Sequence, residues 1–393
     1  MSHLQNQSWL AISRSALRHN ANLLRQITGP AAFGAVIKSN AYGHGFLETA
    51  RTLEPCVDWF CVNTLSEALD LYQINQHTPC LVMGLNGQDL QLLADQDPKI
   101  LKSFLRPIHV AVSDPALACD WLNRYPELQL HLKIDSGLSR LGCNPDTLLQ
   151  QPEQLQDLAS RINPQSGRPN WTGLMTHFAN VEDVSEQGYA QAQLARFTAL
   201  RQELKRFQPA LLCHTAASAA SLLLPAARLD LVRCGIALYG LWPSNETRLS
   251  CLSQFGQIPE LRPALRWFAR IAHTHRVPAG SSIGYGCTRR VEQDTTIAVV
   301  PVGYYEGYDR LLSNQAYVLI NDQRAPVLGR VSMNMITIDV SLIPAASPGT
   351  PVLLLGNGEH DQVSAEQLAA WSGTINYEVV TRILPAIERR LVD

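Results

Sequence analysis

Short apolar runs alternate with helix-like segments along the first 242 residues of the chain. The apolar runs are rich in β-branched residues and are bounded by turn formers, which is typical of buried strands. The segments between them repeat apolar residues at helical spacing, and Gly29-Pro30 ends the first of these, which begins after Ser13. We expect strands at 33–37, 59–62, 80–83, 108–112, 130–134, 173–176, 211–214 and 231–234, and helices that include 66–74, 115–123, 146–162 and 185–207.

About eight strand–helix units in this length predict an α/β fold, a (β/α)8 TIM barrel over residues 13–242. A doubly wound open sheet produces the same alternation, so the count by itself favours the barrel only weakly.

The pattern changes after residue 242, where strand-like runs predominate and one helical stretch spans 364–371. We therefore expect a mostly β C-terminal domain over residues 243–393, to which residues 1–12 add a strand. Residues 243–262 are expected to form the connection between the two domains. The expected strands of this domain lie at 265–277, 297–302, 317–320, 327–331, 336–340 and 352–355.

Composition narrows the class of protein without identifying it. The 393 residues carry a net charge of −2, and no basic cluster is longer than a pair, which argues against nucleic acid and anionic membranes as partners. No apolar stretch approaches the ~20 residues that span a bilayer, and the N-terminus lacks a signal-peptide pattern, so we expect a cytoplasmic protein. Nine cysteines without a C-x-x-C pair indicate reduced thiols and no metal.

A single lysine stands out at the end of the first expected strand. Lys38 directly follows the apolar run and precedes a turn, Ser-Asn-Ala-Tyr-Gly-His-Gly, that contains Tyr42, Gly43 and Gly45. Burial at this place lowers the pKa of a lysine and makes its amine a nucleophile toward an aldehyde. A lone lysine at a strand end is more often a snorkelling surface residue, so the remainder of the chain must support the reading.

Other chemically active side chains fall at the ends of later strands. Lys133, His177, Ser218 and Arg233 lie at the carboxyl ends of the fifth to eighth expected strands. Barrel active sites occupy this face, and the loops after strands seven and eight commonly bind phosphate. Each residue alone has an ordinary structural explanation, but five at one end of one barrel, with Lys38 among them, predict an active site.

Several segments together resemble the alanine racemase family over nearly the whole chain. Besides the lysine segment they are LKIDSGLSRLG, GLMTHFAN and LVRCGIALYG in the first part, and IGYGCTRR, PVGYYEG, GRVSMNM and INYEVVTRI in the second. The resemblance implies an enzyme of fold type III that uses pyridoxal 5′-phosphate, an isomerase that interconverts L-alanine and D-alanine and supplies D-alanine for peptidoglycan. It also implies a head-to-tail homodimer with shared active sites.

The resemblance further implies the role of each residue. Lys38 would link covalently to the cofactor and act as base on one face, and Tyr285 of the partner chain would act on the other, because racemisation needs acid/base groups on both sides. His177 would bond the phenol of that tyrosine, with Arg233 beyond it, against the ring nitrogen. The remaining implied cofactor ligands are Tyr42, Ser218, Gly235, Ile236 and Tyr377, and the implied substrate-binding residues are Arg140, Met333 and Tyr304, with Lys133 carbamylated as partner of Arg140.

Two departures from the family pattern leave the substrate open. Ala217 stands where the family commonly has Asn, and Asn334 where it commonly has Asp. A racemase for serine or several small amino acids is therefore an alternative. A decarboxylase of the same fold type is disfavoured by Arg233 and by the absence of a matching motif around Cys287. A cofactor-holding single barrel is disfavoured by the β domain, and a structural barrel by the number of agreeing motifs.

Overall fold

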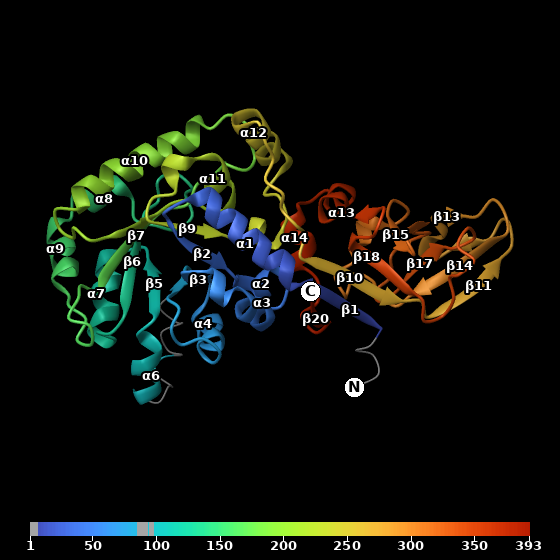
Figure 1. Ribbon diagram of the computed structural model, residues 1–393, viewed down its shortest axis with the longest axis horizontal. Coiled ribbons are helices and arrows are strands. Elements are labelled where there is room, and N and C mark those ends of the chain that lie inside the picture. Colours follow the sequence, from blue (N-terminus) through green and yellow to red (C-terminus); the bar gives the residue numbers. More distant parts are fainter. Residues whose placement is uncertain (1–6, 85–92, 94–97) are drawn as a thin grey trace. The chain divides into compact units, whose positions relative to one another are not determined.

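The computed structural model describes residues 7–84, 93 and 98–393 (Figure 1). The chain divides into two compact units. One comprises Met1–Leu17, Asn40–Glu48 and Arg262–Asp393, and the other comprises Arg18–Ser39 and Thr49–Leu261. The predicted domain boundary after residue 242 is not tested by this division and stays a prediction.

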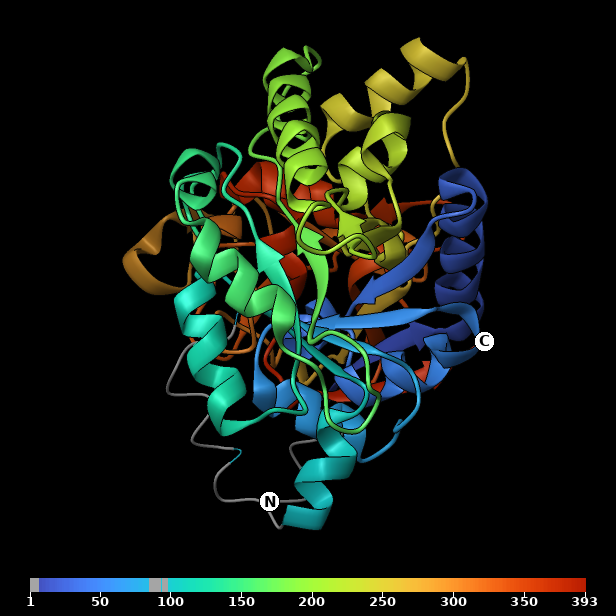
Figure 2. The ribbon, with the colours of Figure 1, turned by 90° about the vertical axis from the view of Figure 1, so that its left-hand side faces the viewer.

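The second unit is built on eight parallel strands in the order β8-β7-β6-β5-β4-β3-β2-β9, with helices around them (Figure 2). This nearly closed sheet confirms the TIM barrel against the open doubly wound alternative. Its strands are β2 (Ala32–Val36), β3 (Trp59–Val62), β4 (Cys80–Val82), β5 (Ile108–Val112), β6 (Gln129–Lys133), β7 (Trp171–Met175), β8 (Leu212–His214) and β9 (Leu231–Cys234).

Helices flank these strands, and those expected after Ser13 and over 66–74, 115–123 and 185–207 are confirmed. They are α1 (Arg14–Thr28), α3 (Phe46–Leu53), α4 (Leu65–Tyr72), α6 (Pro98–Leu105), α7 (Pro115–Arg124), α8 (Pro145–Leu149), α9 (Pro152–Ser160), α10 (Gly188–Leu204), α11 (Ser218–Leu223) and α12 (Asn245–Phe255). One helix expected over 146–162 is two, α8 and α9, because Pro152 lacks the N–H that would continue a helix and instead starts a new one. The segment expected to be a connection, 243–262, contains α12, which Ser244 caps by accepting a bond from the Thr247 N–H at 2.9 Å.

The barrel closes between β8 and β9 without a regular ladder. Asp230 bridges this seam: its N–H donates to the Cys213 carbonyl at 3.0 Å, and its carboxylate accepts from the Cys213 N–H at 2.8 Å. Further along, the Arg233 N–H donates to the Ala216 carbonyl at 2.9 Å. The seam therefore brings Arg233 beside the ends of β8 and the loop that follows it.

The first unit contains the other strands of the described residues. Its largest sheet has the order β16-β15-β18-β10-β1-β20, with β19 on β18, and smaller sheets join β11-β14-β17 and β12-β13. These strands are β1 (Ser8–Ser13), β10 (Leu265–Arg270), β11 (His273–Val277), β12 (Ser282–Ile283), β13 (Arg289–Arg290), β14 (Thr295–Val300), β15 (Tyr317–Ile320), β16 (Gln323–Pro326), β17 (Ile336–Asp339), β18 (Pro351–Asn357), β19 (Gln362–Val363) and β20 (Glu388–Val392). Helices α13 (Ala365–Ser372) and α14 (Asn376–Thr381) complete it, together with part of the turn α2 (Lys38–Tyr42).

Two expectations for this unit are wrong. The run expected over 265–277 is two strands, β10 and β11, which belong to different sheets. The strand expected at 327–331 is absent from this described segment: β16 ends at Pro326, and Val327 forms only an isolated bridge with Ile338. The sequence did not reveal β16 because this edge strand is almost wholly exposed, with only Ala325 buried, so it carries no apolar pattern.

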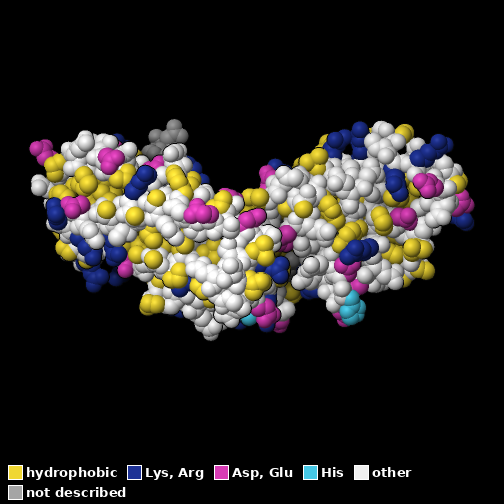
Figure 3. All heavy atoms as spheres, turned by 90° about the horizontal axis from the view of Figure 1, so that it is seen from above, with side chains coloured by type: hydrophobic (Ala, Val, Ile, Leu, Met, Phe, Trp, Pro, Cys, Tyr) yellow, Lys and Arg dark blue, Asp and Glu magenta, His cyan; other side chains and the backbone are white. Residues whose placement is uncertain are grey.

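On the face drawn in Figure 3, basic and acidic side chains are both present on each unit, as a net charge of −2 leads one to expect. Within the part of the chain that the structure describes, no helix is both long and apolar enough to cross a membrane.

Candidate active site

The predicted barrel residues all lie at or just beyond the carboxyl ends of their strands. Lys38 follows β2 after one residue, Lys133 is the last residue of β6, and His177 lies two residues after β7. Ser218 begins α11, and Arg233 lies within β9 beside the seam. The strand order thus places these side chains on the face of the barrel where active sites form.

The backbone after Lys38 is left-handed, which the sequence did not indicate. Ser39, Asn40, Ala41 and Tyr42 have φ between 52° and 55°, so α2 is a left-handed helical turn made of non-glycine residues. Such a conformation costs roughly 1–2 kcal/mol per residue and is held only by surrounding bonds. The Ser39 N–H donates to Glu67 Oε1 at 2.7 Å, and Asn40 Oδ1 accepts from the Phe46 N–H at 2.8 Å.

Cations converge on the barrel site and shift each other's protonation. Burial and then the charge of Arg140 lower the pKa of Lys38, although Glu67 acts in the opposite direction. Burial, Arg140, Arg233 and Lys38 lower the pKa of Lys133 to about 8. Burial and the charges of Arg233, Arg140, Lys133 and Lys38 lower the pKa of His177 to about 3, so that its imidazole is neutral near pH 7.

Arg233 lies at the centre of this positive region with only 2% of its surface exposed. Its Nη1 donates to His214 Nδ1 at 2.6 Å, and its Nη2 donates to the carbonyl oxygens of Thr176 at 2.9 Å and Thr215 at 3.2 Å. These partners are neutral. Burial lowers the pKa of Arg233 to about 10, which still leaves the guanidinium charged at pH 7.

Ser218 joins the two loops in which the sequence predicts a phosphate site. Its buried Oγ accepts from the Gly235 N–H at 2.9 Å and from the Ala237 N–H at 3.4 Å. Ala217 occupies the N-cap of α11 and provides no side-chain cap, which is the local consequence of having no Asn there. Ile236 follows Gly235 in the same buried loop.

Within the other unit, Tyr42 lies beside Tyr377, with 6.2 Å between the ring centroids. The adjoining backbone is tightly packed: a Cβ on Gly43 would lie 2.0 Å from the Val380 carbonyl oxygen, so only glycine fits. Arg389 also donates from Nη2 to the Gly43 carbonyl at 3.1 Å. This packing holds the predicted pair of phosphate-binding tyrosines together.

The remaining predicted residues of this unit are exposed. Tyr285 is 71% exposed, in a turn where Gly284, Gly286 and Cys287 all have positive φ. Tyr304 and Met333 are 43% and 55% exposed.

Two turns bring Tyr304 and Met333 near each other. The Tyr304 N–H donates to the Ser332 carbonyl at 3.1 Å, and the Tyr305 N–H donates to the Met333 carbonyl at 2.9 Å. Asn334 Nδ2 donates to Glu306 Oε1 at 2.7 Å, so the residue that departs from the family pattern has its own partner.

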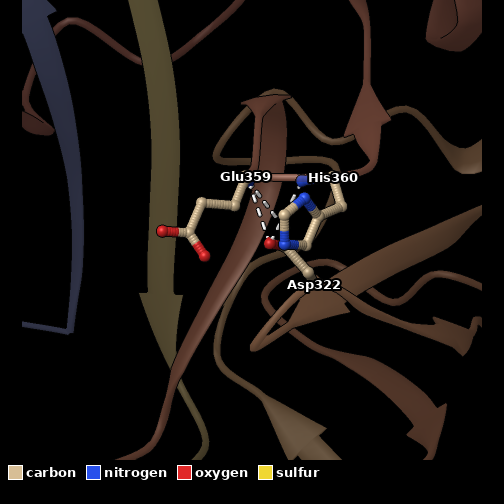
Figure 4. A group of neighbouring side chains, drawn as sticks. All are labelled: Asp322, Glu359 and His360. Atoms are coloured by element: carbon tan, nitrogen blue, oxygen red, sulfur yellow. Dashed lines mark hydrogen bonds between the residues drawn. The ribbon is translucent and has the colours of Figure 1, made fainter.

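One group of side chains among the described residues has the spacing of a cation site, namely Asp322, Glu359 and His360 (Figure 4). The Asp322 carboxylate accepts from the N–H groups of Glu359, at 2.9 Å, and His360, at 3.2 Å. These bonds are those of a turn-capping aspartate. The group therefore needs no ion to explain its geometry.

Comparison with known proteins shows the family. The alanine racemase N-terminal domain family matches residues 12–243, and the alanine racemase C-terminal domain family matches residues 264–391. The chain belongs to the alanine racemase family.

Individual alanine racemases match the chain from end to end. The protein named alanine racemase from Leptospira interrogans is 38% identical over 390 residues, which cover 98% of this chain and 96% of that protein. The one from Desulforamulus reducens is 36% identical over 375 residues and covers 95% of each chain. The crystal structure of alanine racemase from a D-cycloserine-producing Streptomyces lavendulae superimposes with a TM-score of 0.84 at 29% identity, covering 99% of this chain and 97% of that one. Membership of this family makes the chain an enzyme of the isomerase class.

Three buried histidines inside the barrel, His109, His131 and His214, were not predicted from the sequence. The sequence did contain one signal for these histidines. His131 lies two residues before Lys133, so the two side chains project from the same face of β6. A polar residue on the inner face of a buried parallel strand is unusual enough to mark a site.

The buried histidines predict that this protein loses stability in weak acid. An unfolded histidine titrates near pH 6.5, so below that pH the unfolded state binds more protons than the folded state, and stability falls as the pH drops. Each group contributes up to about 1.4 kcal/mol per pH unit. The folded-state pKa is lowered to about 4 for His44 and to about 3 for His109 and His177, and well below the ordinary value for His131 and His214, in each case mainly by burial.

The measurement is the urea midpoint of unfolding between pH 7 and pH 5, where carboxylates contribute little. The midpoint should fall steadily below pH 6.5. His109→Gln should make the unfolding free energy less dependent on pH in this range, by up to about 1.4 kcal/mol per pH unit. His77→Gln is the matched control, because His77 is exposed and should leave the slope unchanged. A midpoint that stays constant from pH 7 to pH 5 would contradict the assignment of neutral buried histidines.

Proposed function

We propose that this chain interconverts L-alanine and D-alanine with pyridoxal 5′-phosphate as its cofactor, and that it supplies D-alanine for peptidoglycan. The observation that carries the proposal is the convergence of Lys38, Lys133, Arg140 and Arg233 on a neutral His177 at the carboxyl end of the barrel. A site with this excess of positive charge favours an anionic ligand. The names of the relatives supply the reaction.

The residues present fit pyridoxal phosphate chemically. A lysine of lowered pKa suits an aldehyde, the Ser218 loop suits a phosphate, and a buried guanidinium held only by neutral groups suits an unprotonated ring nitrogen, which accepts a hydrogen bond. When bound, the cofactor supplies the electron sink that acidifies the α-proton of an amino acid. The residues that would hold it are Lys38, Tyr42, His177, Ser218, Arg233, Gly235, Ile236 and Tyr377.

Arg233 would restrict the reaction to proton exchange. An arginine at the ring nitrogen keeps that nitrogen unprotonated, whereas a carboxylate would keep it protonated and strengthen the electron sink. Arg233 would thereby favour return of a proton to the α-carbon over transamination. The partners of Arg233 support this role, because none of the groups to which it donates is a carboxylate.

Two bases on opposite faces would move the proton. The Lys38 amine would take or return it on one face, which its lowered pKa favours near neutrality. Tyr285 of the second subunit would act on the other face. An ordinary phenol has a pKa of about 10, so it needs a neighbour that accepts its hydrogen bond, and neutral His177 is the candidate.

Substrate binding would depend on Arg140, Tyr304 and Met333. Arg140 would contact the cofactor phenolate or the substrate carboxylate. Lys133 has a pKa lowered to about 8, so an appreciable fraction is the neutral amine that reacts with carbon dioxide. A carbamate on Lys133 would convert a like-charged neighbour of Arg140 into an anionic partner.

We propose a head-to-tail homodimer in which the β unit completes the site of the other subunit. Tyr285, Tyr304 and Met333 are large apolar or aromatic side chains, and their exposure in one chain is typical of a surface that a partner covers. Their predicted roles in the site require the same partner.

A broader racemase that also accepts serine is the second candidate. The Asn334 amide bonds to Glu306, whereas an aspartate in the same place would set two carboxylates against each other. Asn334 thus has a neutral amide where the family commonly has a negative charge, and this change is what favours a pocket that accepts side chains other than that of alanine.

Chiral analysis of L-alanine and of L-serine incubated with the protein and pyridoxal phosphate tests the function. We expect alanine to racemise at least about tenfold faster than serine, because one added hydroxyl is discriminated by that order in a small pocket. Equal or faster conversion of serine would establish the broader racemase. Conversion of neither would refute both.

Replacement of the proposed second base tests the mechanism. Tyr285→Phe should lower racemisation in both directions by about 10²- to 10⁴-fold, while exchange of the α-proton of one enantiomer with deuterated solvent continues through Lys38. Tyr305→Phe is the control, since Tyr305 is also an exposed tyrosine but has no proposed role. An unchanged rate in Tyr285→Phe would remove Tyr285 from the mechanism.

Mixing two inactive variants tests the shared site. Lys38→Ala and Tyr285→Phe chains, combined one to one, should recover about a quarter of the sites, because half of the dimers are mixed and each restores one site of two. The activity of the mixture is compared with that of each variant alone. No recovery, with subunit exchange shown independently by differently tagged chains, would mean that both bases come from one chain.

A further inference from the structure

Three histidines form a continuous hydrogen-bonded chain through the barrel interior to Arg233. Arg233 Nη1 contacts His214 Nδ1 at 2.6 Å, His214 Nε2 contacts His131 Nδ1 at 2.7 Å, and His131 Nε2 contacts His109 Nδ1 at 3.2 Å. His109 Nδ1 also lies 3.1 Å from the Thr172 hydroxyl. The histidine chain, as we call His214, His131 and His109, thus spans strands β8, β6 and β5.

The chemistry of Arg233 fixes the direction of every bond in the chain. A guanidinium only donates, so His214 Nδ1 must accept and its proton must be on Nε2. That N–H then donates to His131 Nδ1, which places the His131 proton on Nε2 and directs it to His109 Nδ1. All three imidazoles are therefore neutral Nε2–H tautomers, with their dipoles aligned in one direction. Such alignment strengthens each bond in turn.

The residues packed around the histidine chain leave space for its imidazole rings. Barrel interiors are ordinarily filled by branched aliphatic side chains, whereas here Trp59 packs against His109, with 4.6 Å between ring centroids, and against His131 at 5.7 Å. Gly173 pairs with His131 in the β6–β7 ladder, and a Cβ there would lie 2.5 Å from the imidazole ring. The sequence therefore leaves room for the His131 ring where any other residue would displace it.

We propose that His131 and His109, acting through His214, are positioning residues that fix the orientation and hydrogen-bonding direction of Arg233 toward the cofactor ring. The proposal rests on the proposed function, since it assumes that Arg233 faces the ring nitrogen. Reversal of the His214 tautomer would set an N–H against the Arg233 N–H, and the guanidinium would lose one of its three acceptors. The histidine chain prevents this, because each ring is bonded at both the accepting and the donating nitrogen except at the far end.

Neutron diffraction from deuterated crystals of the cofactor-free protein tests the geometry without any activity. We expect deuterium on Nε2 of His214 and of His131, and none on Nδ1 of either ring. Deuterium on His214 Nδ1, or on both nitrogens of any ring in the chain, would overturn the proposal.

Substitutions at His131 test the consequence. His131→Phe keeps an aromatic ring but offers His214 no acceptor, whereas the Oδ1 of His131→Asn replaces the accepting Nδ1. We expect His131→Phe to weaken binding of pyridoxal phosphate and lower kcat, each by about tenfold, with KM for alanine within about twofold, as loss of a supporting hydrogen bond does around other bound groups. His131→Asn should recover most of both losses.

Trp59→Phe is the packing control, because it alters the contacts of His109 and His131 and none of the chain's hydrogen bonds, and it should leave both readouts near the parent values. Equal losses in His131→Asn and His131→Phe, or an equal loss in Trp59→Phe, would reduce the chain to a structural role. The two hypotheses fail separately: an inactive parent protein refutes the proposed function, whereas an active parent with unaffected His131→Phe refutes only the role of the histidine chain.

Discussion

Arg233 carries a positive charge inside the barrel, and the groups that hold it are all neutral. Removing a guanidinium from water is costly unless its N–H groups are satisfied. Here one imidazole nitrogen and two backbone carbonyls, of Thr176 and Thr215, satisfy them. The loops after β7 and β8 must therefore turn so that these carbonyls face β9, and His214 must remain neutral. Much of the local structure at the barrel mouth follows from this one requirement.

The same charge sets the protonation of the surrounding groups. Lys133 and His177 have lowered pKa values because they are buried and because Arg140 and Arg233 repel further protons. A neutral histidine can accept a hydrogen bond and a lysine of lowered pKa can react, whereas the ordinary protonated forms can do neither. Positive charge confined at one end of the barrel thus does two things at once: it favours an anionic ligand and it prepares the groups that would act on it.

The strained backbone after Lys38 and the irregular closure between β8 and β9 both lie near the proposed site. The left-handed turn after Lys38 is unfavourable for each of its non-glycine residues and is held by the Glu67 carboxylate and by Asn40. The seam between β8 and β9 lacks a ladder and relies on Asp230 and Arg233. Both irregularities border proposed site residues. Parallel ladders join the other seven neighbouring pairs of strands, with one register shift, between Leu130 and His131 in the β6–β7 pair, and they supply the rigidity that these irregular segments lack.

The sequence by itself determined the order and type of most elements, because burial imposes a short-range pattern on a strand or helix that neighbouring residues reveal. It also located Lys38, Lys133, His177, Ser218 and Arg233 at strand ends, since chain order alone places them there. The local sequence pattern did not reveal the helix break before Pro152 or the exposed strand β16. It also gave no sign of the left-handed turn after Lys38. The histidine chain was decided only by tertiary structure: His109, His131 and His214 lie 22 and 83 residues apart. Only the strand order and register of a closed barrel bring such distant side chains within hydrogen-bonding distance.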